Sequence, residues 1–227
     1  VGPASYLLDL NIGDYIDSFD LVIRINRGME LIPQYSEKLG KRTDILFHCL
    51  LESLDNGGVI DIDFYKKNNL KWFCTMPKTG FNGKVFPYSF PKNTNYFSLL
   101  KVLFNFNFHK VSSTILSEIQ KEINCKPNTG LISIIDTLSF KPKKLFITGF
   151  SFYLDSFIKG YKSGCSKNED LFSEQCFLSI RHNQLNQWNY LKIKYKDNKN
   201  IILTDKILEQ ILQMKRLDRD GFKNEII

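Results

Sequence analysis

The sequence predicts an α/β fold: a single Rossmann-like domain with a mostly parallel central sheet flanked by helices. Short apolar, β-branched runs recur along the chain, and segments with apolar residues at helical spacing separate them. Strands that alternate with helices usually form parallel sheets with both faces covered. The length of 227 residues suits one domain with its own core, so we treat residues 1–227 as a single unit.

The predicted strands share apolar and β-branched residues over strand length. They comprise, in chain order, residues 19–26, 43–48, 70–74, 145–150 and 201–203. The predicted helices show apolar residues at helical spacing or acidic residues in a first turn. They comprise residues 6–10, 61–67, 95–124 as two helices broken near 108–110, 129–138, 184–196, and 205–215 with Asp205 or Thr204 as the cap.

The net charge of +7 and the pI near 9.0 favour an anionic partner: a nucleotide, a nucleic acid, an acidic glycan or a membrane surface. An AT-rich genome would also enrich lysine without selection for binding, so both interpretations stay open. The lysines are dispersed and no nucleic-acid motif accompanies them, so we predict no nucleic-acid partner.

The five cysteines are scattered and form no CxxC pair, which argues against a zinc site or a disulfide framework. This cysteine usage favours a reducing compartment, and we predict a cytoplasmic location. No apolar run approaches the roughly 20 residues that span a bilayer, and no signal peptide is recognisable. Val1-Gly2-Pro3 is typical of a strand end, so we expect the natural protein to begin upstream, where a membrane anchor or Golgi placement stays open.

Residues 126–133 contain the strongest candidate for an anion site. Thr129-Gly130 opens an apolar helix between two strands, and a helix start presents backbone N–H groups and a positive dipole end. The chain has no GxxxxGK[ST] loop and no GxGxxG loop, which disfavours an NTPase or a dinucleotide oxidoreductase.

Three further groups of residues are candidates for chemistry, and each has a structural alternative. Asp61-Ile62-Asp63 spells a metal-binding pattern of glycosyltransferases, but it also suits the first turn of a helix. His48 and His109 are expected to be structural, whereas His182 precedes a helix and would suit a general base. Tyr153 and Tyr161 could donate hydrogen bonds to a leaving phosphate, or they could simply pack.

In combination, these segments resemble the sialyltransferases. Residues 1–26 and 39–43 resemble the long sialyl motif of the eukaryotic-type enzymes, and residues 127–131 with 144–150 resemble their short motif. His182 is similar to the histidine of the very short motif. The order of a basic residue, a Thr-Gly turn, tyrosines and a late histidine is also similar to that of the bacterial sialyltransferases.

The resemblance implies a sialyltransferase-type GT-A variant. It would be a metal-independent, inverting glycosyltransferase that moves an acidic sugar from a CMP-activated donor to a glycan hydroxyl. It implies no cofactor beyond the donor substrate, either CMP-sialic acid or CMP-Kdo. Catalytic roles would fall to His182 as base and to Lys126, Tyr153 and Tyr161 at the leaving phosphate. The nucleotide and donor would be held by residues at strand ends and in the Thr-Gly turn: Gly2, Pro3, Ala4, Ser5, Asn26, Asn128, Thr129, Gly130, Gly149 and Phe150.

Two residues depart from the family pattern. Pro3 stands where the family usually has asparagine, and Gln187 stands where a glutamate is expected. They motivate an alternative function, a catalytically inactive module that binds nucleotide or glycan. We expect a lid around residues 156–173, and we expect acceptor choice to lie there and in residues 79–95. The partners would be the CMP-sugar and a glycan acceptor; oligomeric state and membrane association are not predicted.

Overall fold

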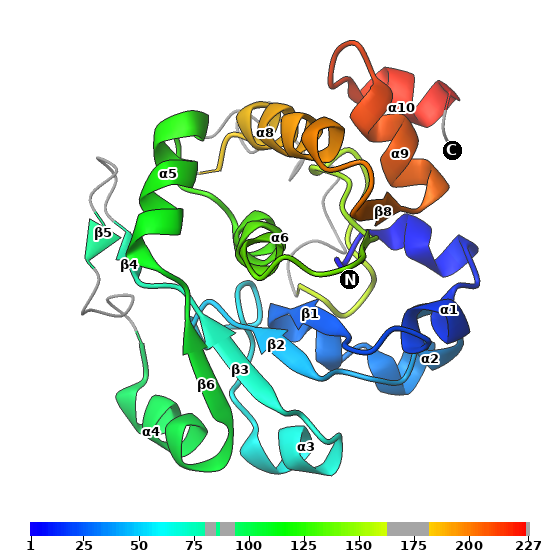
Figure 1. Ribbon diagram of the computed structural model, residues 1–227. Coiled ribbons are helices and arrows are strands. Elements are labelled where there is room, and N and C mark those ends of the chain that lie inside the picture. Colours follow the sequence, from blue (N-terminus) through cyan, green and yellow to red (C-terminus); the bar gives the residue numbers. More distant parts are fainter. Residues whose placement is uncertain (80–84, 87–93, 163–181, 226–227) are drawn as a thin grey trace.

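The computed structural model describes residues 1–79, 85–86, 94–162 and 182–225 (Figure 1). Its central element is a four-stranded parallel sheet in the order β1-β2-β3-β6. The strands are β1 (Ile23–Ile25), β2 (Ile45–Phe47), β3 (Trp72–Thr75) and β6 (Asn107–Lys110). All four point their carboxyl ends to one edge of the sheet, where ligands of such folds bind.

A second parallel pair, β7 (Leu145–Ile147) and β8 (Ile202–Thr204), lies beside this sheet. The first two residues of the chain connect the two sheets. The amino group of Val1 donates to the carbonyl of Ile23, 2.8 Å away, and the Gly2 N–H donates to the carbonyl of Thr148 at 2.7 Å. A separate antiparallel pair joins β4 (Lys78–Thr79) to β5 (Val85–Phe86).

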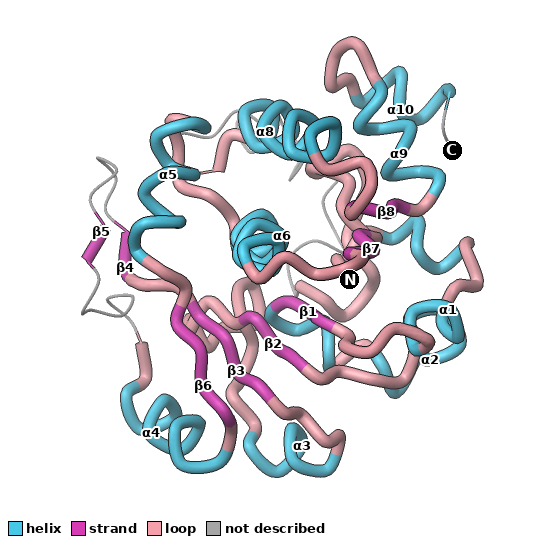
Figure 2. The backbone as a smooth tube through the Cα atoms, viewed as in Figure 1, coloured by secondary structure: helices cyan, strands magenta, loops and turns pink. Residues whose placement is uncertain are grey.

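Helices cover both faces of the central sheet (Figure 2). On one face, α5 (Ser113–Ile123) and α6 (Thr129–Ser139) bury Leu116 and Ile132 against side chains of β1, β2 and β3. The opposite face packs against a set of short helices: η2 (Asn26–Met29), α2 (Ile32–Leu39), α3 (Ile62–Lys67) and α4 (Tyr96–Asn105). This layered arrangement confirms the predicted α/β fold.

The remaining helices surround β7 and β8. The largest apolar cluster joins α5, α6 and β7 to the C-terminal helices through Trp188, Leu208 and Phe222. These helices are α8 (Gln184–Asp197), α9 (Lys206–Gln213) and α10 (Arg219–Glu225), and η1 (Ser5–Asp9) with α1 (Gly13–Asp17) completes this side. In the described parts of the chain, no helix is both long and apolar enough to cross a membrane.

The break predicted near residues 108–110 is confirmed, because it separates α4 from α5, but the sequence analysis missed that the break is itself a strand. Residues 107–110 form β6, an edge strand of the central sheet. Helix α4 ends at Asn105, and its C-cap Phe106 has an extended backbone. From there, polar and aromatic residues alternate with a period of two, which is a strand pattern. The sequence analysis missed this short strand pattern, because apolar residues at helical spacing precede and follow it within residues 95–124.

Other boundaries differ by a few residues. The strands predicted at 19–26 and 145–150 are shorter, since β1 covers only residues 23–25 and β7 only residues 145–147. Asn26, with φ of 46°, directly follows β1, and Gly149, with φ of 78°, lies two residues after β7. Of the two proposed caps of α9, the structure selects Asp205, which accepts from the Leu208 N–H at 2.7 Å. The proposed lid extends into residues 163–173, outside the described residues. The assignment of residues 1–227 to a single domain stays a prediction.

Candidate active site

A cavity of about 650 Å³ opens at the carboxyl ends of β1, β2, β3 and β7. Its lining joins residues far apart in the sequence, from Pro3 and Ala4 through Asn26 and Cys49 to His182. Most of the predicted site residues lie here: Pro3, Ala4, Asn26, Lys126, Asn128, Thr129, Gly130, Gly149, Phe150, Tyr153, Tyr161 and His182. The size suits a nucleotide-sized ligand.

The start of α6 forms one side of the cavity. Asn128 caps this helix, and its Oδ1 accepts from the Leu131 N–H at 2.8 Å. The Asn128 N–H is also occupied, because it donates to Oε1 of Gln187 at 2.9 Å. Among the described residues, neither the Thr129 N–H nor the Gly130 N–H has an acceptor. Two backbone donors therefore lie at a helix start that lines the cavity, an arrangement that binds anions.

Glycines allow the backbone to pack tightly behind the cavity. A Cβ on Gly149 would lie 2.5 Å from the carbonyl oxygen of Gly2, and one on Gly2 would lie 2.2 Å from that of Gly149. At Gly130, a Cβ would meet the Phe150 ring at 2.5 Å. These positions therefore accept no side chain without movement of the chain.

Two of the predicted donor-binding residues do not line the cavity. Gly2 supports it from behind through its contact with Gly149. The hydroxyl of Ser5 donates to the carboxylate of Asp155, 2.8 Å from its Oδ2, and also contacts the Ser156 hydroxyl at 2.7 Å. The Tyr6 N–H donates to the same carboxylate, so Asp155 binds the first two residues of η1.

A buried polar network holds Gly149. The Tyr6 hydroxyl donates to Oδ2 of Asp205 at 3.0 Å and accepts from the Gly149 N–H at 2.9 Å. The Thr148 hydroxyl donates to the same carboxylate oxygen at 2.7 Å. Burial, followed by the neighbouring Asp205 charge, raises the pKa of Tyr6 well above its ordinary value, so this phenol keeps its proton.

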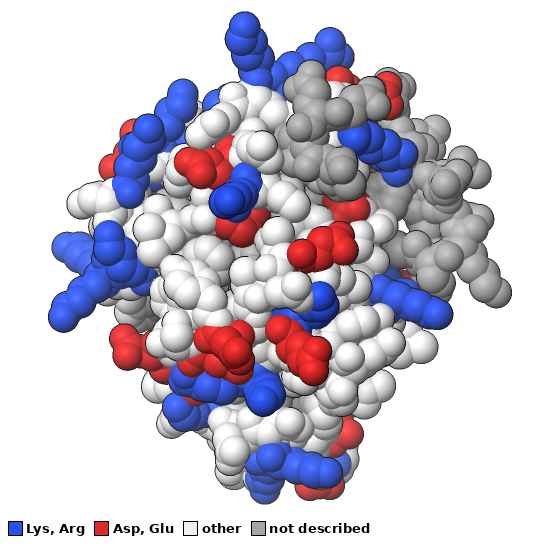
Figure 3. All heavy atoms as spheres, turned by 90° about the vertical axis from the view of Figure 1, so that its right-hand side faces the viewer, with Lys and Arg blue, Asp and Glu red and all other residues white. Residues whose placement is uncertain are grey.

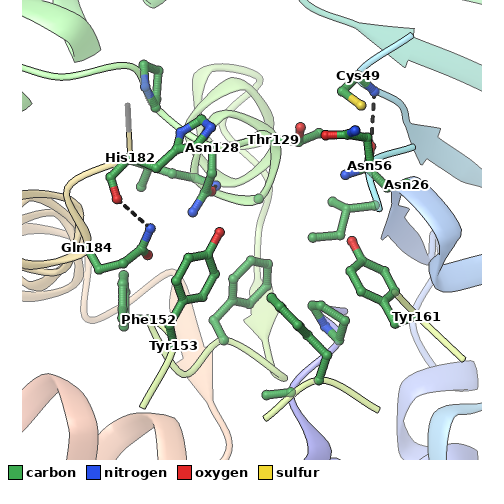
Figure 4. A pocket seen from close by; sticks show the side chains of 18 of the residues that line it. Asn26, Cys49, Asn56, Asn128, Thr129, Phe152, Tyr153, Tyr161, His182 and Gln184 are labelled. Atoms are coloured by element: carbon green, nitrogen blue, oxygen red, sulfur yellow. Dashed lines mark hydrogen bonds between the residues drawn. The ribbon is translucent and has the colours of Figure 1, made fainter. Parts of the chain in front are cut away.

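His182 lies directly beside the start of α6. Its Nδ1 is 2.9 Å from the carbonyl oxygen of Lys126. A carbonyl only accepts, so Nδ1 carries the proton and the neutral ring has its lone pair on Nε2. Figure 4 shows the ring beside Asn128, and Gln184 donates to the His182 carbonyl at 2.7 Å. The imidazole is thus held in the tautomer that a general base requires.

Gln187 is a residue whose contribution the sequence analysis missed. It is fully buried, accepts from the Asn128 N–H and donates to the Asn183 carbonyl at 3.4 Å. It therefore ties the first turn of α8 to the start of α6. The only signal in the sequence was that an amide stands where the family pattern has a carboxylate.

The two tyrosines occupy different ends of the cavity. Figure 4 shows Tyr153 on the side of His182 and Asn128, whereas Tyr161 faces Asn26 and Asn56. Phe152 and Tyr153 both have left-handed backbone conformations, with φ of 50° and 65°, and such strain is common at functional sites. Burial raises the pKa of Tyr161, and the hydrogen bond to Asn26 opposes this shift. The two hydroxyls therefore face different surroundings and are not interchangeable.

Asn26 and the loop after β2 form the other side of the cavity. Oδ1 of Asn26 accepts from the Cys49 N–H at 3.0 Å, as Figure 4 shows. Burial raises the pKa of the Cys49 thiol, although Lys126 and Lys162 lower it in part. The loop also contributes Asp55 and Asn56 to the lining. Sequence reasoning missed these two, because no motif marks a loop that the fold brings to the strand ends.

The remaining candidates have structural roles. Oδ1 of Asp61 accepts from the Phe64 N–H at 2.9 Å and so caps α3, which packs on the opposite face of the central sheet from α6. His48 is buried, with its Nε2 2.8 Å from the Gly57 carbonyl. His109 on β6 pairs with Asp136 of α6 at 2.9 Å. In the described ranges, no cluster of three or more His, Cys, Asp or Glu residues could hold a metal ion.

Comparison with known proteins decides the family. The family model of glycosyltransferase family 29 (sialyltransferase) matches residues 1–140, more than half of the chain. The chain belongs to glycosyltransferase family 29, the sialyltransferases. Neither the curated proteins nor the solved structures gave a significant match. The family assignment confirms the resemblance predicted from the sialyl motifs and identifies a domain of the glycosyltransferase class.

The family match covers only part of the cavity. It includes Asn26, Cys49 and the whole of α6, and it ends at Phe140, the C-cap of that helix. Tyr153, Tyr161 and His182 lie beyond the matched residues. Their placement in the cavity therefore comes from the fold, and their catalytic roles remain predictions.

The charge distribution is mixed on the face that α1, α2 and α9 form. Figure 3 shows lysine and arginine side chains interspersed with acidic ones there, without a continuous basic stripe. Nucleic-acid-binding surfaces usually concentrate their positive charge. This face of the family 29 domain therefore gives no support to a nucleic-acid partner.

Proposed function

We propose that this domain transfers an acidic sugar, sialic acid or a related ulosonic acid such as Kdo, from a CMP-linked donor to a glycan hydroxyl. The observation that carries the proposal is the Nδ1 contact of His182 with the Lys126 carbonyl. It sets a potential base beside the anion site at the start of α6. A neutral imidazole with its lone pair on Nε2 is suited to accept a proton from a hydroxyl.

The transfer step exchanges one bond for another. The acceptor oxygen attacks the anomeric carbon, its proton passes to Nε2 of His182, and the bond from that carbon to the phosphate oxygen breaks. CMP leaves with the bonding electrons. Attack from the face opposite the phosphate inverts the anomeric centre.

Stabilisation of the leaving CMP is assigned to the start of α6. The N–H groups of Thr129 and Gly130 and the ammonium group of Lys126 all line this part of the cavity. Donors that are fixed before the reaction stabilise charge as it develops on the phosphate. Tyr153 would add a hydroxyl on the same side, whereas Tyr161, which lies near Asn26, would contact the nucleotide. With these groups, we propose that the reaction needs no metal ion.

The direct experiment measures CMP release from CMP-sialic acid and from CMP-Kdo, with and without EDTA. We expect turnover of at least one donor, at a rate that EDTA leaves unchanged. No binding and no turnover of either donor would overturn the proposal. Loss of turnover in EDTA, restored by a divalent cation, would overturn the metal-free step alone.

One alternative has an observation in its favour. Pro3 and Gln187 replace residues that the family pattern expects, which suits a module that binds CMP or glycan without catalysis. Gln187, however, has a structural task at Asn128 that does not need a carboxylate. Tight CMP binding without any turnover in the same experiment would favour the inactive module.

A further inference from the structure

Helix α4 is apolar on both sides. Leu99 and Val102 are buried against the sheet, as expected for a covering helix. Its other side exposes large apolar side chains: Tyr96, Phe97, Leu100, Leu103 and Phe104. Phe97 is 67% exposed and Phe104 is 85% exposed. A helix that is apolar all round is normally covered on all sides, so this face has the character of a contact surface.

Lysines outnumber acidic residues in the described segments that precede and contain α4. Residues 59–79, 85–86 and 94–110 contain six lysines and two aspartates, a net charge of +4. Lys101 is the only charged residue of α4, and its ammonium group lies 4.5 Å from the centre of the Phe97 ring. The adjoining α3 ends in the exposed Lys66 and Lys67, while its two aspartates lie at its start.

A half-exposed tryptophan lies at the same edge. Trp72 begins β3 and pairs in register with Asn107, which directly follows the end of α4. It is 41% exposed, whereas the only other tryptophan, Trp188, is 2% exposed. Aromatic side chains beside lysines are typical of helices that lie in the interface of a bilayer.

We propose that the exposed face of α4 docks on a lipid bilayer that contains anionic lipids. Phe97, Leu100 and Phe104 would enter the boundary between headgroups and acyl chains. Lys66, Lys67 and Lys101 would contact the anionic headgroups, because basic side chains near the surface of an anionic membrane are attracted to it. The positive charge favours a bilayer over a second copy of the chain, whose own lysines would face these.

The position of the face is compatible with catalysis. In Figure 1, α3 and α4 lie at the lower edge of the sheet, whereas α6 and the strand ends that form the cavity lie away from it. Docking through α4 therefore leaves the cavity uncovered. The inference does not depend on the proposed transfer reaction, and it can fail or succeed independently.

The test measures binding to vesicles of phosphatidylcholine alone and of phosphatidylcholine with phosphatidylserine, by flotation. We expect binding to the mixed vesicles that weakens as salt is raised, and little binding to the neutral ones. Tryptophan emission should shift to the blue on binding, and Trp72→Phe should abolish the shift, because Trp188 is already buried.

Matched variants locate the contact. Leu100→Asp combined with Phe104→Asp should weaken vesicle binding at least about tenfold, because each change removes a large apolar side chain from the contact. Leu21→Asp is the control, since Leu21 is 52% exposed and Leu100 is 51% exposed. Leu21 precedes β1, away from α4, so its replacement should leave binding unchanged. Unchanged thermal unfolding shows that the variants fold.

Three results would overturn the proposal. The first is that the wild type does not bind the anionic vesicles. The second is that the double variant binds them as tightly as the wild type. The third is that Leu21→Asp weakens binding as much as the double variant does. A concentration-dependent dimer that the double variant disrupts, without vesicle binding, would assign the face to a second copy of the chain instead.

Discussion

Two walls of the cavity are built in different ways. The glycine wall (Gly2, Gly149, Tyr6 and Asp205) depends on backbone that approaches within contact distance and on a buried polar network. The helix wall (Lys126, Asn128, His182 and Gln187) is joined by hydrogen bonds between side chains and backbone of separate segments. The first wall leaves no space for other residues, whereas the second could be built with other side chains of similar hydrogen-bonding capacity.

The comparison predicts that the glycine wall is the more sensitive to substitution. Gly149→Ala should produce the largest loss of stability, because the new Cβ would meet the Gly2 carbonyl and because φ is +78°. The left-handed conformation costs about 1–2 kcal/mol, and the overlap adds about 1–3 kcal/mol. Urea unfolding measures the change.

Gly160→Ala is the matched control for this substitution. Gly160 also has a positive φ, +95°, but the nearest atom to its Cβ would be 3.7 Å away. Gly160→Ala should therefore lower the free energy of unfolding only by the cost of the left-handed conformation, about 1–2 kcal/mol. Equal losses of unfolding free energy in the two variants would show that the close approach of Gly2 and Gly149 does not limit the side chain at position 149.

The polar network behind the same wall should give the next effect. Tyr6→Phe removes the acceptor of the Gly149 N–H and a donor to Asp205, and should lower the free energy of unfolding by about 1–3 kcal/mol. Tyr15→Phe, at an exposed tyrosine, should change it little. If the two variants unfold alike, the network contributes nothing to the wall.

On the helix wall, CMP binding should depend on whether residue 187 can accept a hydrogen bond, and less on which accepting side chain it is. Gln187→Leu leaves the Asn128 N–H without its acceptor and should weaken CMP binding about tenfold. Gln187→Glu keeps an acceptor and should weaken it less. Titration calorimetry with CMP compares them, and a larger loss for Glu than for Leu would contradict this account of the wall.

The smallest predicted effect depends on pH. The hydrogen bond to Asp136 raises the pKa of His109 above 6.5, against the effect of burial. The pair therefore stabilises the fold fully below pH 6.5, and this contribution is lost as pH rises through the higher folded-state pKa. Because the ring is 28% exposed, we expect less than about 1 kcal/mol. In His109→Gln, the free energy of unfolding should no longer fall as pH rises through this range. If the variant and the wild type show the same pH profile, the pair does not contribute to stability.

The sequence could predict the features of the site that follow local rules. Strand ends and the Asn-Thr-Gly turn follow local rules, and they located Asn26, Asn128 and Gly149 at one edge of the sheet. The turn at Gly149 was expected to bind the donor, and the structure shows that it also receives Gly2. The same local rules located the break after α4 but missed β6, because this edge strand of four residues follows an apolar helix so closely.

The helix wall explains what the sequence could not predict. The bond of Gln187 to Asn128 joins residues 59 positions apart, and no spacing rule relates them. Asp55 and Asn56 reach the cavity only because a loop folds back after β2. Tertiary packing brings such residues together, and local patterns in a single sequence do not reveal it.

The most direct test of the account is the substitution His182→Asn. The amide that it introduces could still donate to the Lys126 carbonyl, as Nδ1 does now at 2.9 Å, but it could not accept a proton from the acceptor hydroxyl. Sugar transfer from the CMP-linked donor that the wild type uses should fall about 10²–10⁴-fold, while CMP affinity stays the same. Transfer at the wild-type rate would contradict the role of His182 as the base.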